Sequence, residues 1–364
     1  MKTDLEQYRI DLKARCKPIH GHGYPDSVNE LQRVAEWCTS ENPGQDFYGT
    51  GELIQEFEGK LAALFGKPSA RFMPSGTMAQ GIAMRLWSGA GGHFGMHPTS
   101  HLELHEQRGY SHLFGLRATL IGPEGRPMLR QDLESLTESI GALIIELPTR
   151  ENGGQLPSWD ELVELCGLAR ERGCRLHLDG ARIWEAQAAM GHSFEEIGAL
   201  FDSVYASFYK GIGALSGAML IGPADFIQEA QLWQRRMGGN LFSLLPNVAS
   251  AASRFDQQLA RFPLYLTQAQ GLAEGLAQVS GLRLLPDKPQ TSMMHVQLDL
   301  DPDPALTERD RVAEETGLWL LGQARPGPLE GQSRFEISIG DAFAELDVND
   351  VVQAFQSLLH PQLP

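Results

Sequence analysis

One lysine stands in an unusual setting, between aromatic residues and glycines, in the segment Ser207-Phe208-Tyr209-Lys210-Gly211-Ile212-Gly213. This setting is not typical of a solvated surface lysine. Burial lowers the pKa of a lysine, and the neutral amine is the form that makes a Schiff base with a carbonyl compound. Ser207, three residues earlier, could reach a phosphate group. The Gly-x-Gly spacing does not lead from a strand into a helix with an acidic residue beyond it, so we reject a dinucleotide-binding loop.

An aspartate and an arginine lie close together in His177-Leu178-Asp179-Gly180-Ala181-Arg182. The preceding residues, 174–178, read as a strand, and ligands of open α/β sheets bind at the carboxyl ends of strands. An aspartate there can hold a protonated ring nitrogen. Arg182 could bind a carboxylate through its planar guanidinium group. The alternative is a strand-to-helix turn with an Asp cap and a surface arginine.

A possible phosphate site follows the short apolar stretch 70–73, at Ser75-Gly76-Thr77, just before a helical pattern that runs to Trp87. Backbone N–H groups at a helix N-terminus bind phosphate with help from the helix dipole. Glycine lets the backbone approach closely, and the hydroxyl groups add donors. The alternative, an ordinary helix cap at Ser75 or Thr77, is common.

Four histidines recur every four residues, at His93, His97, His101 and His105. On one helix they would share a face, as metal ligands can, and a metal-binding protein is the corresponding alternative. Glycines at 91, 92 and 95 and a proline at 98 disfavour a continuous helix there, so we predict no metal site. His101 could instead stack on an aromatic cofactor.

Strand and helix patterns alternate through most of the chain, which favours an α/β fold with a mainly parallel sheet flanked by helices. Buried strands are expected at 142–147, 174–178, 203–206 and 217–221, and helices at 50–65 and 159–172. From about residue 286 the pattern is that of a small α+β module. The first 45 residues read as irregular. We expect an N-terminal segment (1–45), a large domain (46–250) and a small C-terminal domain (251–364).

The composition restricts the class of protein. The 364 residues carry a net charge of −16, which disfavours binding to nucleic acid or to an anionic membrane surface. No apolar run is long enough to span a membrane, and the N-terminus does not read as a signal peptide. Four scattered cysteines form no zinc or redox motif. We therefore expect a cytoplasmic protein with reduced thiols.

Six segments, in order, resemble the threonine aldolase branch of the fold-type I enzymes that use pyridoxal 5′-phosphate (PLP), also called the β-eliminating lyase group. One such motif would be weak, but six in order are specific for the family. The segments are DFYGTGELIQEFEGKLAALFGKPSARFMPSGTMAQ, SHLELHEQRGYSHLFG, HLDGARIWEA, SFYKGIGALSGAMLIG, LWQRRMGGNL and SRFEISIGDAFAELDV.

The resemblance implies a role for each residue that matches a family motif. Lys210 would carry PLP covalently, Asp179 would pair with the pyridine nitrogen, and His101 would stack on the ring. Further cofactor contacts are implied for Ser75, Gly76, Thr77, Arg182, Ser207 and Arg235.

The resemblance also implies how the substrate and the subunits are arranged. Arg334, with help from Arg182, would hold the α-carboxylate of an amino-acid substrate. Tyr48 is implied as a further substrate-binding residue. A homodimer or homotetramer is implied, with the active site at the subunit interface, where Tyr48 and Arg235 would approach a neighbour's cofactor.

Two segments depart from the family pattern at the substrate end. The family often carries Asn-Thr-His after the strand that matches 142–147, but here residues 147–152 are Leu-Pro-Thr-Arg-Glu-Asn, without a histidine. The N-terminal Arg-Ser-Asp segment is replaced by Ala14-Arg15-Cys16-Lys17. The departures leave the cofactor assignment intact but make threonine itself a less certain substrate.

The expected activity is cleavage of the Cα–Cβ bond of a β-hydroxy-α-amino acid to glycine and an aldehyde, with PLP as the electron sink. His101 and a water molecule are candidates for the base that takes the β-hydroxyl proton, followed by His105 and His112. The nearest alternative is β-elimination or another PLP-dependent lyase reaction. A non-catalytic PLP-binding protein is a further alternative.

Overall fold

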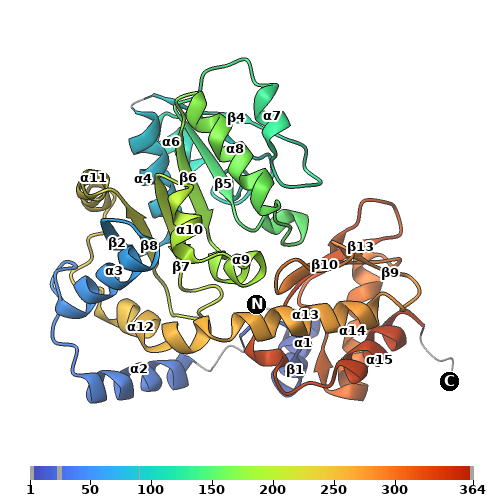
Figure 1. Cartoon of the computed structure of the whole chain (residues 1–364). Helices are drawn as coiled ribbons and strands as arrows, with labels where there is room; N and C mark the ends of the chain where they lie inside the picture. Colours follow the sequence, from blue (N-terminus) through green and yellow to red (C-terminus); the bar gives the residue numbers. More distant parts are fainter. Residues whose placement is uncertain (1–3, 23–26, 90, 361–364) are drawn as a thin grey trace. The chain divides into compact units, whose positions relative to one another are not determined.

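A computed structural model describes residues 4–22, 27–89 and 91–360, and these form two compact units (Figure 1). The larger unit lies within residues 25–261, apart from the short stretch Asn152–Gln155. The smaller unit comprises the N-terminal residues up to 24, Asn152–Gln155 and the chain from Phe262 onward. None of the described helices combines the length and the apolar character that crossing a membrane requires.

The larger unit is built on a seven-stranded sheet in the order β2-β8-β7-β6-β5-β3-β4. β8 runs antiparallel to both of its neighbours, and the other described pairs in this sheet are parallel. The predicted α/β class with a mainly parallel sheet is confirmed. The strands are β2 (Ser69–Met73), β3 (His93–Met96), β4 (Arg117–Leu120), β5 (Ala142–Glu146), β6 (Arg175–Gly180), β7 (Ser203–Ser207) and β8 (Ala218–Gly222).

The central strands are buried because helices cover the sheet (Figure 1). Every residue of β7 and β8 is buried, which explains why their sequences lack the apolar–polar alternation of a half-exposed strand. α4 packs on β5 to β8, and α8 and α9 pack on β6. The helices are α2 (Ser27–Glu41), α3 (Glu52–Leu64), α4 (Gly76–Ser88), α5 (His101–Leu104), α6 (Gly109–Phe114), α7 (Arg130–Glu134), α8 (Trp159–Glu171), α9 (Ile183–Met190), α10 (Phe194–Ala199), α11 (Ala224–Arg236) and α12 (Leu245–Leu259).

The smaller unit contains an antiparallel sheet in the order β12-β13-β10-β9 and a two-stranded parallel sheet of β1 and β11. Its helices α13, α14 and α15 pack with one another or with these strands. The elements are α1 (Asp4–Arg15), β1 (Lys17–Pro18), α13 (Phe262–Leu276), β9 (Leu282–Leu285), β10 (Met293–Leu298), α14 (Pro302–Thr316), β11 (Leu318–Trp319), β12 (Arg325–Pro326), β13 (Ser333–Ser338) and α15 (Val348–Leu359).

The prediction that the first 45 residues are irregular is wrong. α1 is anchored in the smaller unit because Arg9 pairs with Asp310 of α14 at 2.7 Å. α2 is anchored in the larger unit because its Glu30 binds Arg254 of α12 at 2.6 Å. Both helices expose most of their residues, and the apolar residues of α1 are not gathered on one face. The larger unit also keeps α12, so the division falls at 261 where the sequence suggested 250.

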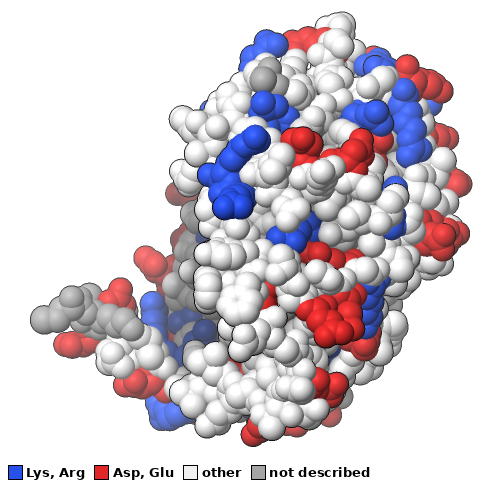
Figure 2. All heavy atoms as spheres, turned by 90° about the vertical axis from the view of Figure 1, so that its left-hand side faces the viewer, with Lys and Arg blue, Asp and Glu red and all other residues white. Residues whose placement is uncertain are grey.

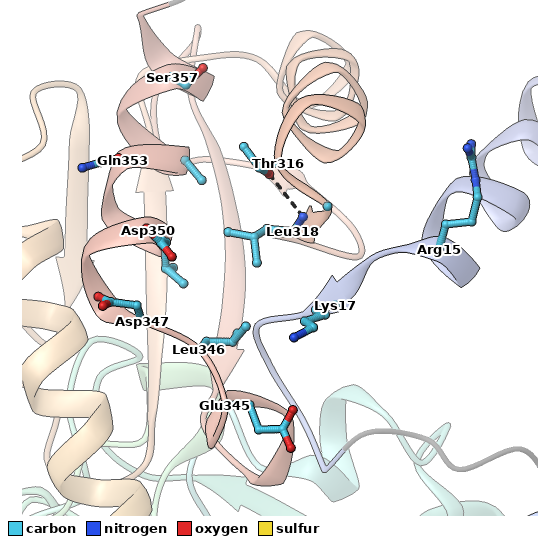
Figure 3. Close-up of a pocket in the computed structure, with 13 residues that line it drawn as sticks. Arg15, Lys17, Thr316, Leu318, Glu345, Leu346, Asp347, Asp350, Gln353 and Ser357 are labelled. Atoms are coloured by element: carbon cyan, nitrogen blue, oxygen red, sulfur yellow. Dashed lines mark hydrogen bonds between the residues drawn. The ribbon is translucent and has the colours of Figure 1, made fainter.

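Lysine and arginine side chains are interspersed with aspartate and glutamate on the face shown in Figure 2, and they form no continuous basic surface there. A groove of about 760 Å³ opens in the smaller unit beside α15 (Figure 3). Its lining mixes Arg15 and Lys17 with Glu345, Asp347 and Asp350. None of the predicted site residues lines it.

Candidate active site

The strand pairing brings several predicted site residues to one edge of the large sheet. Ala218 of β8 pairs with Met73 at the end of β2 and with Ser207 at the end of β7. The Ser75-Gly76-Thr77 segment, which follows β2, therefore begins at the same edge as Ser207. Asp179 lies near the carboxyl end of β6, the next strand along. This edge is the ligand-binding edge of an open α/β sheet.

Three polar side chains form a row across neighbouring strands. Glu146 of β5 pairs in register with Asp179 of β6, and Asp179 pairs with Tyr205 of β7. Residues that pair in this way project from the same face of a sheet. His177, two residues before Asp179, contacts Gln80 of α4 at 2.8 Å. The row therefore projects from the face that α4 covers.

Burial makes the two carboxyl groups of this row hard to ionise. Burial raises the pKa of Asp179, and the nearby Lys210 cation and the Ala181 N–H group oppose that shift. Burial, followed by the Asp179 charge, raises the pKa of Glu146 to about 8. Glu146 Oε1 accepts a hydrogen bond from the Arg150 N–H group at 3.2 Å, while Oε2 has no hydrogen-bond partner among the described residues. Strongly shifted groups of this kind gather at functional sites.

Lys210 lies within electrostatic reach of Asp179, Glu146 and Arg182. Burial lowers its pKa to about 8, and the Arg182 charge adds to this shift, while Asp179 and Glu146 oppose it. A substantial fraction of the amine is therefore neutral near physiological pH, as nucleophilic attack on a carbonyl group requires. The structure thus brings together Lys210, Asp179 and Arg182, which the sequence had placed in two separate segments.

The loop that carries Lys210 rests on a cluster of buried aromatic rings. Phe208 is fully buried, and its ring contacts the rings of Phe57, Phe72, Trp184 and Phe255. Trp184 also donates a hydrogen bond from Nε1 to the carbonyl oxygen of Ser207 at 2.8 Å. The loop turns tightly because the Gly213 N–H group bonds the Lys210 carbonyl oxygen at 3.0 Å. These contacts fix the backbone on both sides of the lysine.

The predicted phosphate segment forms the first turn of α4. The Ser75 hydroxyl caps the helix by accepting a hydrogen bond from the Met78 N–H group at 3.3 Å, so the capping interpretation is correct for this side chain. A methyl group on Gly76 would lie 2.1 Å from Oη of Tyr205, so only glycine fits at this position. Thr77 is exposed. The helix N-terminus and its N–H groups remain suited to an anion.

The four regularly spaced histidines do not share a helix. His93 lies in β3 and contacts Thr119 at 2.7 Å. His97 is buried, and its ring nitrogens contact Thr99 and the carbonyl oxygen of Pro123. Within the described ranges, no group of three or more His, Cys, Asp or Glu side chains could hold a metal ion.

His101 begins α5, and His105 follows the last residue of that short helix. His101 Nδ1 lies 2.9 Å from Oε1 of Glu106, and His105 Nε2 lies 2.9 Å from Oε1 of Glu151. The charges of His101 and Glu106 are close enough to influence the pKa of Asp179. His101 is therefore near the carboxylate predicted to hold the cofactor ring.

The remaining predicted residues lie on other elements of the fold. Tyr48 is half exposed in the loop before α3, and Arg235 is exposed near the end of α11. Arg334 is exposed on β13 of the smaller unit, where it pairs in register with Gln297 and Arg325.

Comparisons with known proteins agree with this geometry. A sequence profile of the β-eliminating lyase family matches residues 26–299. The chain belongs to the β-eliminating lyase family. The predicted family membership and the fold-type I class are confirmed.

Three known proteins illustrate what the chain is similar to. A solved structure of a candidate L-allo-threonine aldolase from Listeria monocytogenes is 39% identical, with a TM-score of 0.91, and the match covers 97% of this chain and 99% of that one. The low-specificity L-threonine aldolase of Escherichia coli K12 is 27% identical over 78% of this chain and 86% of its own length. A structure of serine palmitoyltransferase with PLP shares the fold at 17% identity, with a TM-score of 0.70, and covers 94% of this chain and 86% of its own.

This member of the family is a PLP-dependent enzyme, as the sequence predicted. The site itself fits this cofactor. It offers a buried carboxyl group at Asp179 for a protonated ring nitrogen, a lysine of lowered pKa, and a helix N-terminus where Gly76 leaves no side chain in the way. Sequence reasoning missed Glu146, Tyr205, Glu106 and Glu151. Only the position of Glu146 at a strand end, after the apolar run ALII, offered a signal.

The buried carboxyl group of Glu146 predicts a pH-dependent stability of the cofactor-free lyase. The folded-state pKa of about 8 lies above the ordinary value of 4.5, so the folded protein holds a proton that the unfolded chain releases. The corresponding stability is present below about pH 4.5 and is lost as the pH rises toward 8. Glutamine has no carboxyl group to ionise, so Glu146→Gln should lose less stability as the pH rises. Its urea midpoint should therefore drop less between pH 5 and pH 9 than that of the wild type.

Glu164 is an exposed glutamate on α8 and provides the matched control. Glu164→Gln should keep the wild-type pH dependence. Equal drops in the urea midpoint for the wild type and Glu146→Gln would show that Glu146 is ionised in the folded protein.

Proposed function

We propose that this enzyme cleaves the Cα–Cβ bond of a β-hydroxy-α-amino acid and releases glycine and an aldehyde. The observation that carries the proposal is the cluster of Lys210, Asp179 and Arg182 at the carboxyl ends of β6 and β7, in a chain 39% identical to a candidate L-allo-threonine aldolase. PLP, when bound, accepts the electron pair of the broken Cα–Cβ bond.

The proposed roles of the cofactor-site residues follow from their positions. Lys210 provides the neutral amine for the covalent link to the cofactor. Asp179 keeps a proton on the ring nitrogen, because a carboxylate in a buried site favours a cation beside it. His101 stacks on the ring. Phosphate contacts are assigned to the first turn of α4, with Gly76 and Thr77, and to Ser207.

For the substrate carboxylate we propose Arg334, with help from Arg182. An amino-acid enzyme needs a fixed cation for this group, and arginine offers two parallel donors where lysine offers a single point charge. Arg334→Ala should raise the dissociation constant for glycine, measured by calorimetry on the holoenzyme, without loss of PLP. Arg334→Lys should also bind glycine more weakly. Unchanged glycine binding in both variants would remove Arg334 from the site.

The activity is tested with a panel of β-hydroxy-α-amino acids that includes L-threonine, L-allo-threonine and serine. Because residues 147–152 lack the family histidine, we expect another panel member to be cleaved better than threonine. Glycine and an aldehyde should form in equal amounts. Formation of a keto acid and ammonia, without glycine, would instead identify a β-eliminating activity.

We further propose that the enzyme is a homodimer or homotetramer that associates through an aromatic patch of the larger unit. The patch consists of Phe47, Tyr48, Leu241 and Phe242, each of which is at least 41% exposed. Its backbone is held firmly. The Tyr48 N–H group bonds the Phe242 carbonyl oxygen at 2.9 Å, and buried Arg71 donates to the carbonyl oxygen of Gly49 at 3.0 Å. A rigid, exposed apolar patch is typical of an interface.

Phe242→Asp should weaken self-association, because it places a charge within the patch, and sedimentation velocity should then show smaller species. Leu329→Asp is the matched control, since Leu329 is also 63% exposed but lies in the smaller unit. Identical sedimentation of Phe242→Asp and the wild type would exclude this patch as the interface.

A cytoplasmic location is part of the proposal. The four cysteines are free thiols, and Cys166 and Cys174 are buried. This usage suits a reducing compartment.

A further inference from the structure

Two carboxylate–imidazole pairs lie side by side next to the proposed PLP site. The rings of His101 and His105 have centroids 5.0 Å apart and are tilted by 43°. Glu106 binds His101, and Glu151 binds His105, each at 2.9 Å. The side chains of Glu106 and Glu151 are only 7% and 15% exposed, so each carboxylate is held within the protein rather than in solvent.

The position of His105 follows from its neighbours on both sides. On one side it contacts His101, whose charge influences the pKa of Asp179. On the other side it contacts Glu151, which directly follows Arg150, and the charge of Arg150 influences the pKa of Lys210. His105 thus contacts one residue that influences the pKa of Asp179 and another whose chain neighbour influences the pKa of Lys210. Its side chain is 29% exposed, so the ring is accessible to solvent.

The hydrogen bonds determine which ring nitrogen of His105 is free. A carboxylate can only accept, so Nε2 carries the proton that it donates to Glu151. In the neutral ring, Nδ1 then keeps its lone pair and can accept a proton. A carboxylate that orients a histidine in this way also stabilises the imidazolium that forms when the proton is taken up.

The turn after β5 supplies the carboxylate of the His105–Glu151 pair. Residues 147–152 contain no histidine. The same turn instead supplies Glu151, which reaches across to His105. The turn therefore provides the partner of an imidazole whose ring comes from another segment.

We propose that His105, oriented by Glu151, accepts the proton of the substrate's β-hydroxyl group. The assignment rests on the proposed retro-aldol function. The proton moves from the hydroxyl oxygen to Nδ1 of His105, and the O–H electron pair becomes the second bond of the aldehyde carbonyl group. The Cα–Cβ bond breaks, and its electron pair leaves with Cα. His105 releases its proton to solvent, and one proton returns to Cα to give glycine, so the reaction balances.

The test compares His105→Phe, Glu151→Gln and the wild-type holoenzyme. Phenylalanine keeps an aromatic ring beside His101 but cannot accept a proton. We expect the turnover number for cleavage of the best panel substrate to fall about 100-fold or more in His105→Phe, the usual effect of removing a general base. Glu151→Gln keeps an acceptor for Nε2 but loses the charge that stabilises the imidazolium, so we expect turnover to fall in this variant too.

Three further measurements separate this role from a structural one. Glycine lacks a β-hydroxyl group, so its dissociation constant and the exchange of its α-proton with deuterium should stay within about twofold of wild type in both variants, as expected when only a transition-state interaction is lost. The ¹⁵N NMR spectrum of histidine-labelled apoprotein should show His105 protonated at Nε2. His360 is exposed just after α15, and His360→Phe should leave cleavage unchanged.

The outcomes distinguish the proposed role of His105 from the proposed retro-aldol function of the enzyme. Normal cleavage by His105→Phe, or an Nδ1-protonated His105 in the wild type, overturns the assignment of His105 alone. A wild-type enzyme that binds glycine but cleaves no panel member overturns the proposed function, and the role of His105 with it. Loss of glycine exchange in His105→Phe would show that His105 supports the cofactor site instead of acting on the hydroxyl group.

Discussion

Lys210→Ala should abolish the borohydride-reducible adduct with PLP and lower turnover by several orders of magnitude. The amine is the covalent attachment point in our proposal, and its pKa of about 8 makes it reactive near neutral pH. No other group can replace a missing nucleophile, so the loss is of the size seen when a covalent catalyst is removed. The loop should keep its shape because Phe208 and Trp184 fix it independently of the lysine side chain.

Mass spectrometry after borohydride reduction and proteolysis provides the measurement. The wild type should carry the cofactor mass on the peptide that contains Lys210. Lys288 is an exposed lysine of the smaller unit, and Lys288→Ala should behave as the wild type does. A reduced adduct on any other lysine would show that the attachment site is misassigned.

Asp179→Asn should produce a folded protein that binds PLP but turns over substrate orders of magnitude more slowly. An amide cannot balance the positive charge of a protonated ring nitrogen. A charge-assisted hydrogen bond contributes roughly 1.5–3 kcal/mol before any transition-state effect is counted. Asp179 Oδ1 accepts a hydrogen bond from the Ala181 N–H group at 3.1 Å, and an asparagine carbonyl oxygen can keep that bond.

The stability of Asp179→Asn separates a chemical effect from a structural one. Burial disfavours the charged form of Asp179, so a neutral amide should leave the urea midpoint of the apoprotein unchanged or higher. Asp160 is exposed on α8, and Asp160→Asn should match the wild type in turnover. Turnover of Asp179→Asn within about tenfold of the wild type would argue against a role in stabilising the electron sink, since a tenfold change corresponds to only about 1.4 kcal/mol.

The sequence predicted the strands that carry the site because they are continuous apolar runs between turn signals. β5, β7 and β8 fall within a residue or two of their expected positions. β3 was missed because His93 and Gly95 interrupt its apolar pattern, and β4 was missed because none of its residues is fully buried. α1 was missed because its sequence has no clear apolar face, and ion pairs rather than a large core hold both α1 and α2.

The site residues divide into those that a local motif reveals and those that depend on contacts between distant segments. Lys210, Asp179 and Ser75 stand in local motifs that a single segment can reveal. Glu106 and Glu151 act through contacts with histidines, and Glu151 is 46 residues from His105 along the chain. No local pattern encodes such a pairing. It depends on how α5 and the turn after β5 come together, which only the folded structure shows.

The contact between Gly76 and the Tyr205 hydroxyl group links two positions that are far apart in the chain. Residue 76 can gain a side chain only if residue 205 gives up volume, so the two positions should covary among homologues. In enzyme engineering, a substitution at position 205 is therefore a way to adjust the position of the first turn of α4. A smaller residue at 205 would let the first turn of α4 settle closer to the sheet, and the phosphate group that we propose for this turn would move with it.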